Sequence, residues 1–159
     1  MRKKIIVLIM ICFIARFISI YLFQFVLVQG DSMSPAYKPW QLVIMSKYPS
    51  QLKTGDIIVF QCASLDTVLI KRVVACPGDT VQIKNGILYV NGFDTRETFP
   101  YGLIEYAGIA ETPLILKADE YFVLGDNLEY SKDSRYTDIG CVKKDDILGT
   151  VLPKIPISR

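Results

Sequence analysis

An apolar run near the N-terminus constrains the fold of this chain more than any other feature. After the basic cluster Arg2-Lys3-Lys4, residues 5–28 carry a single charge, at Arg16. A helix of this length would reach about 36 Å, enough to cross a hydrocarbon core of about 30 Å with some tilt. We therefore predict that 1–28 is a cytoplasmic N-terminus with a transmembrane anchor, and that 29–159 forms an extracytoplasmic domain.

A cleaved signal peptide is the alternative interpretation of this run. Its apolar core would be shorter, and a small-x-small cleavage site should follow it. The run ends instead with Val26-Leu27-Val28-Gln29, so an uncleaved anchor is favoured. A charge at the centre of a bilayer costs at least about 2.5 kcal/mol. We therefore expect Arg16 to snorkel or to pair with another chain.

Beyond the apolar run, the sequence is typical of a mainly β fold. Short apolar or alternating runs are separated by turn residues, as in strands. Strands are expected over 42–47, 57–62, 68–75, 81–84, 87–90, 121–124 and 147–152. The least regular part, 93–113, is interpreted as a loop or a reduced accessory insertion. The result is one β-rich domain of roughly 130 residues.

Turn signals lie between these expected strands. Asn85-Gly86 predicts a tight hairpin. Gly-Asp pairs recur beside strand ends, where the glycine supplies an unusual backbone angle and the aspartate caps the turn. These pairs begin at Gly30, Gly55, Gly78 and Gly125.

Composition excludes several classes of function. The net charge of +2 is small and the basic residues are scattered, which argues against a nucleic-acid partner. The four cysteines are not spaced as a metal site or a redox pair. Small buried thiols are favoured over a disulfide.

Ser32 follows the apolar run almost directly and is the candidate nucleophile. A serine needs a neighbouring base, usually histidine, to act as a nucleophile. The chain contains no histidine, so a Ser-His-Asp triad is excluded. The proton must go to a lysine, a carboxylate or a tyrosine.

Lys71 is the candidate base. Strand alternation places it on one face with Leu69, Val73 and Ala75, while Arg72 faces the other way. Burial among apolar side chains disfavours the ammonium and lowers the pKa of a lysine towards the range of a working base. The alternative is a lysine on an edge strand, with its stem along the surface.

A third cluster, at 125–135, is dense in hydrogen-bonding groups and follows an expected strand. In an extended stretch Ser131, Asp133 and Arg135 share one side. Ser131 is then placed to hold the lysine amine, and Asp133 and Arg135 are placed to pair. A surface turn with a weak ion pair is the alternative.

Four segments together resemble the successive motifs of type I signal peptidases, also called signal peptidase I. They are Gly30-Asp31-Ser32-Met33-Ser34-Pro35, Gly55-Asp56-Ile57-Ile58-Val59, the stretch 71–79, and Gly125-Asp126-Asn127 with 131–135. The family consists of membrane-bound serine endopeptidases with a β-rich catalytic domain and a Ser/Lys dyad, and it removes signal peptides from exported preproteins. The lysine is typical of its bacterial or organellar branch.

The resemblance implies roles for individual residues. Ser32 would be the nucleophile and Lys71 the general base, with Ser131, Asp133 and Arg135 in support. Gly30 stands where some members have an oxyanion-binding serine, so the Ser32 backbone amide is the expected oxyanion donor. The resemblance implies no metal and no organic cofactor. It implies signal-peptide-bearing preproteins and a lipid bilayer as partners, and substrate pockets that accept small side chains.

Two other functions remain open at this point. One is a catalytically silent, membrane-anchored β-domain that binds exported proteins. The other is a cytosolic, autoproteolytic repressor-type Ser/Lys peptidase, which the N-terminal run disfavours. Tyr37 and Trp40 are expected either at a membrane interface or in the core.

Overall fold

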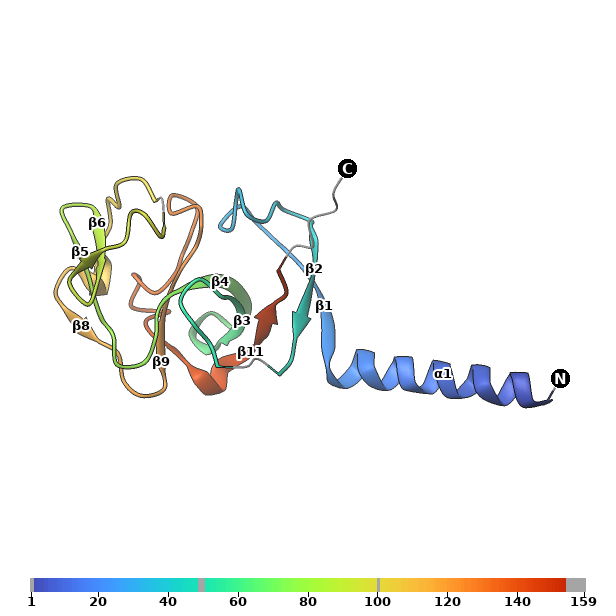
Figure 1. Cartoon of the computed structure of the whole chain (residues 1–159). Coiled ribbons are helices and arrows are strands. Elements are labelled where there is room, and N and C mark those ends of the chain that lie inside the picture. Colours follow the sequence, from blue (N-terminus) through green and yellow to red (C-terminus); the bar gives the residue numbers. More distant parts are fainter. Residues whose placement is uncertain (1, 49–50, 100, 154–159) are drawn as a thin grey trace.

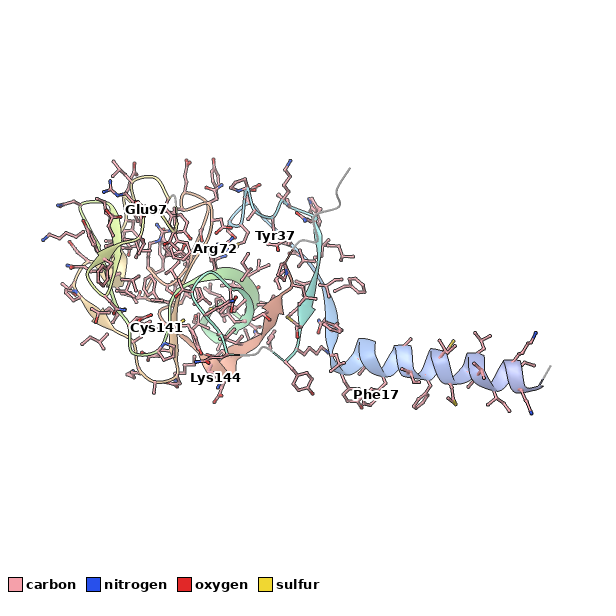
Figure 2. All side chains as sticks on the ribbon, viewed as in Figure 1. Phe17, Tyr37, Arg72, Glu97, Cys141 and Lys144 are labelled. Carbon is pink, nitrogen blue, oxygen red and sulfur yellow. The ribbon has the colours of Figure 1, made fainter. Side chains whose placement is uncertain are left out.

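The computed structural model describes residues 2–48, 51–99 and 101–153. One helix, α1 (Arg2–Tyr21), projects from a body built of two β-sheets (Figure 1). The described side chains of α1 are exposed, as Phe17 shows in Figure 2.

The prediction of one transmembrane helix over 5–28 is wrong. The helix ends at Tyr21, and β1 (Phe23–Leu27) pairs in antiparallel fashion with β2 (Leu42–Ser46) along its whole length. Across the described ranges, no helix is both long enough and apolar enough to cross a membrane. The last third of the apolar run instead belongs to the β-rich body.

The larger sheet has seven strands in the order β1-β2-β11-β3-β4-β9-β10, and neighbouring strands are antiparallel. Its further strands are β3 (Ile57–Cys62), β4 (Thr67–Ala75), β9 (Glu120–Leu124), β10 (Val142–Lys143) and β11 (Ile147–Val151). Strand β4 pairs with β3 on one side and β9 on the other, with Lys71 opposite Ile58. The interpretation of Lys71 as an edge-strand residue is therefore wrong.

The smaller sheet has four strands in the order β7-β6-β5-β8. They are β5 (Thr80–Lys84), β6 (Ile87–Val90), β7 (Phe93–Asp94) and β8 (Leu114–Ile115). The hairpin predicted at Asn85-Gly86 is confirmed, because both residues have positive φ, 52° and 75°, as a type I′ turn requires. Asn91-Gly92 repeats this conformation between β6 and β7, with φ of 54° and 80°.

All of the strands expected from the sequence are present, with bounds that differ by at most one residue. The strands that the sequence did not predict are β1, β7, β8 and β10. In 93–113, interpreted as a loop or a reduced insertion, regular structure is limited to β7 and the short 3-10 helix η2 (Gly108–Ala110) among the described residues.

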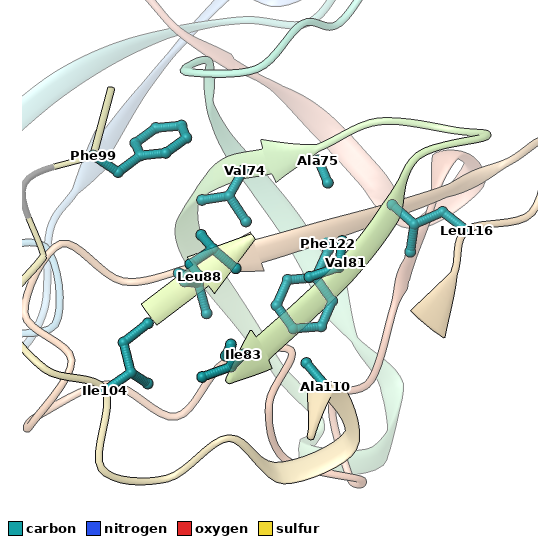
Figure 3. Packing of buried hydrophobic residues seen from close by; sticks show 11 residues of the cluster. Val74, Ala75, Val81, Ile83, Leu88, Phe99, Ile104, Ala110, Leu116 and Phe122 are labelled. Carbon is teal, nitrogen blue, oxygen red and sulfur yellow. The ribbon is translucent and has the colours of Figure 1, made fainter. Parts of the chain in front are cut away.

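A buried apolar cluster joins the two sheets (Figure 3). Val74 and Phe122 from the larger sheet meet Val81 and Leu88 from the smaller one, and each is 3% exposed or less. A register shift between Val73 and Ala75 lets β4 continue towards this cluster. Each such side chain contributes about 1.5–3 kcal/mol by burial, so the sheets are held together as one unit.

Candidate active site

The structure brings Ser32 and Lys71 together from segments far apart in the chain. Lys71 lies on β4, and Ser32 lies in the loop between β1 and β2. The Lys71 Nζ atom lies 2.9 Å from Ser32 Oγ and also donates to the Ile70 carbonyl at 3.0 Å. A distance of 2.9 Å is within the reach that proton transfer from a hydroxyl to an amine requires.

Burial controls the charge of Lys71, which is only 3% exposed. Removal of water lowers the pKa of the amine from 10.5 to about 8, although the carboxylates of Asp133 and Asp126 act in the opposite direction. A pKa of about 8 leaves an appreciable neutral fraction of Lys71 near physiological pH. The site therefore holds an amine that can accept a proton.

The loop that carries Ser32 is anchored on both sides of the hydroxyl. Met33 is fully buried, and its carbonyl accepts a hydrogen bond from the Tyr37 backbone amide at 2.8 Å. The Ser32 carbonyl accepts one from the Asn127 amide at 3.0 Å. Tyr37 belongs to the core, whereas Trp40 is 74% exposed. The position of Ser32 is thus set by buried contacts.

Asp133 and Arg135 form a buried ion pair, as the sequence indicated. Arg135 Nε lies 2.7 Å from Asp133 Oδ1, and Asp133 is fully buried. Asp133 Oδ2 accepts from the Gly125 amide at 3.1 Å, while Arg135 Nη2 donates to the carbonyls of Leu128 at 3.0 Å and Ser131 at 3.1 Å. The alternative of a weak surface pair is therefore excluded.

Ser131 differs from expectation. Its hydroxyl is buried, and among the described residues it makes no hydrogen bond, so the expected contact with the Lys71 amine is absent. It lies close to Gly125, where an added Cβ would be 2.2 Å from Ser131 Oγ and 2.5 Å from the Ser32 carbonyl oxygen. Ser131 is thus packed against the backbone beside Ser32 rather than bonded to the lysine.

A second ion pair was not predicted from the sequence. The Arg72 guanidinium donates to Asp126 through Nε at 2.6 Å and Nη2 at 2.7 Å, and to the Gly55 carbonyl at 2.8 Å (Figure 2 labels Arg72). Asp126 was interpreted as a turn cap. That role is confirmed for Asp56 and Asp79, whose carboxylates accept backbone hydrogen bonds within their own turns. Only the strand register brings Asp126 to Arg72.

A hollow of about 270 Å³ lies beside the Ser32–Lys71 pair. Strand β1 and the residues after it form one side, and β4 forms another. The lining residues are Val26, Leu27, Gln29, Ser32, Val59 and 67–71. Within the described ranges, no group of three or more His, Cys, Asp or Glu side chains is placed to hold a metal ion.

Comparison with known proteins gives a consistent match. Residues 1–154 match the family described as signal peptidase, peptidase S26. The chain is 37% identical over 147 residues to signal peptidase I P of Bacillus subtilis subsp. natto, across 86% of this chain and 78% of that protein. It is 34% identical over 149 residues to signal peptidase I of Bacillus licheniformis, with the same two shares of 86% and 78%.

The fold also matches a solved structure. The crystal structure of a signal peptidase I from Enterococcus faecalis V583 is similar, with a TM-score of 0.51 and 27% sequence identity. The match covers 66% of this chain and 100% of that chain.

Proposed function

Because this chain belongs to the signal peptidase family, peptidase S26, and is a hydrolase of that family, we propose that it removes signal peptides from exported preproteins with Ser32 and Lys71. The observation that carries the proposal is the 2.9 Å distance between Lys71 Nζ and Ser32 Oγ. A lysine can act as the base only when it is neutral, and the burial of Lys71 favours that state.

In the proposed reaction, neutral Lys71 takes the proton from Ser32 as the hydroxyl oxygen attacks the scissile carbonyl. The tetrahedral intermediate collapses to an acyl-enzyme when the mature chain leaves with its new amino group protonated from Lys71. Lys71 then takes a proton from the water that attacks the ester. When the ester bond breaks, Lys71 gives this proton to Ser32 Oγ, and the signal peptide is released. The Ser32 backbone amide is the proposed donor to the oxyanion.

Ser131, Asp133 and Arg135 are proposed to support this pair rather than to react. The Asp133–Arg135 pair fixes the backbone of Gly125, and Gly125 packs against the Ser32 carbonyl. These three residues therefore influence Lys71 indirectly, through packing and through the charge of the Asp133 carboxylate.

The substrate is proposed to lie extended in the hollow between β1 and β4. The volume of the hollow, about 270 Å³, suits small side chains next to the scissile bond, in line with the family resemblance.

The outward residues of β1 and β2, with Trp40, form an exposed apolar face. Phe25 is 63% exposed and Leu42 is 59% exposed. We propose that this face contacts the outer surface of the cell membrane, where preproteins emerge.

The test is cleavage of a preprotein by the full chain in detergent, beside Ser32→Ala and Lys71→Ala. We expect the wild type to release the mature chain and both variants to lose activity. Ser34→Ala is a matched control, two residues from the nucleophile, and should retain activity. Unchanged cleavage by Ser32→Ala or Lys71→Ala would refute the mechanism. Binding without cleavage by the wild type would leave a silent binding domain.

A further inference from the structure

The segment before β8 makes an unusually close contact with the loop 125–135. The Ile109 amide donates to the Arg135 carbonyl at 3.0 Å. A Cβ added at Gly108 would lie 1.9 Å from the Arg135 carbonyl oxygen and 2.7 Å from its carbon. The rings of Tyr106, two positions before Gly108, and Tyr136, directly after Arg135, meet with centroids 4.8 Å apart. Only a residue without a side chain fits at Gly108.

Gly108 also has a backbone conformation that favours glycine, with φ of +56°. An alanine there would need the Arg135 carbonyl to retreat by roughly 1 Å, because non-bonded carbon atoms approach no closer than about 3.5 Å at their optimum. The obstacle is backbone rather than a flexible side chain. The two backbone segments must therefore move apart, and the part of this displacement that the Arg135 carbonyl takes up passes into the loop 125–135.

A continuous series of buried contacts connects Arg135 with the pair of Ser32 and Lys71. The guanidinium holds Asp133 through Nε at 2.7 Å and Nη2 at 3.0 Å. Asp133 holds the Gly125 amide at 3.1 Å, and Gly125 packs against Ser131 and the Ser32 carbonyl. The side chains of Asp133, Ser131 and Arg135 are all 3% exposed or less, so there is little free space to absorb a shift.

We propose that Gly108 is a positioning residue: the close approach that it permits holds Arg135 in place and, through Asp133 and Gly125, sets the geometry of Ser32 and Lys71. This inference rests on the function proposed above. It gives the segment 106–109 a part in the reaction, although it lies outside every motif that carries the family resemblance.

The experiment compares Gly108→Ala with Gly92→Ala in the full chain. Gly92 has a similar positive φ of +80°, but no atom lies within 4 Å of an added Cβ. Both variants therefore carry the strain of a left-handed alanine, and only Gly108→Ala displaces Arg135. Preprotein cleavage is measured as kcat and KM over a range of pH, with Ser32→Ala as the inactive reference.

We expect kcat to fall about 10- to 100-fold in Gly108→Ala and to change little in Gly92→Ala, since a misplacement of about 1 Å can have an effect of this size. We also expect the midpoint of the pH profile to move by about 0.5 or more, because the burial of Lys71 and its distances to Asp133 and Asp126 depend on the loop. Partial unfolding would lower kcat without moving that midpoint.

Equal kcat and equal midpoints in the two variants, with Ser32→Ala inactive, would overturn this inference alone. Activity in Ser32→Ala would instead overturn the proposed function. Should Gly108→Ala fail to fold, Tyr106→Ala removes the neighbouring ring contact and keeps the glycine. It should lower kcat and move the midpoint in the same direction by a smaller amount, and wild-type values there would also overturn the inference.

Discussion

Replacing Lys71 by methionine should stabilise the protein at neutral pH while abolishing its activity. Methionine keeps the length of the side chain but needs no water around its end. Lys71 is 3% exposed, and its pKa in the folded protein is lowered from 10.5 to about 8. Since one pKa unit corresponds to about 1.4 kcal/mol, a charged Lys71 destabilises the fold by about 3 kcal/mol.

The sign of the pH dependence follows from proton binding. Below pH 8 the amine is protonated in both the folded and the unfolded chain, and the full penalty is present. Between about pH 8 and 10.5 the unfolded chain binds a proton that the folded protein does not, so the free energy of unfolding of the wild type rises with pH. Above 10.5 the penalty is gone.

The assay is chemical denaturation of the wild type and Lys71→Met between pH 6 and 11. The stability advantage of the variant should shrink by about 3 kcal/mol across this range. Lys84→Met, which removes an exposed lysine at the end of β5, is the matched control for the substitution itself. A flat difference for Lys71→Met, or one that grows with pH, would refute the assignment of Lys71 as a desolvated amine.

Two further predictions concern the same site. The rate of preprotein cleavage should rise with pH along a single ionisation with its midpoint near 8, because only neutral Lys71 accepts the serine proton; a midpoint near 10.5 in a kcat profile would contradict this. Asp133→Asn leaves the buried Arg135 charge without its partner and should lower the free energy of unfolding by about 3–5 kcal/mol in denaturant titrations. A loss under about 1 kcal/mol would be typical of an exposed pair and would argue against this account.

The sequence predicts the longer, central strands of the sheets, but it does not predict β1 or the two-residue strands. Apolar runs locate the central strands: the stretch 68–75, which forms most of β4, is apolar except at Lys71 and Arg72. The two-residue strands β7, β8 and β10 are too short to show a period. Strand β1 was missed because it continues an apolar run, and no glycine, proline or charged residue marks the change from helix to strand at Leu22.

The candidate residues of the site could be predicted from their chemical type. The contacts that depend on strand register or on loop packing could not. The absence of histidine excludes a Ser-His-Asp triad, and the apolar neighbours of Lys71 make this residue a candidate base before any coordinates are known. The pairing of Arg72 with Asp126 spans 54 positions and requires the alignment of β4 with β9. The close approach of Gly108 to Arg135 likewise depends on how two loops pack, which no local pattern records.

Strand β1 has a mechanical consequence for the whole molecule. Only Leu22 separates it from α1, and the Lys47 ammonium holds the Ile20 carbonyl at the end of the helix at 2.8 Å. Residues 23–27, between the helix and Ser32, are thus a hydrogen-bonded strand rather than an unpaired linker. Strand β1 therefore connects α1 to the loop that carries Ser32 through paired backbone, with only 28–31 between the end of the strand and Ser32.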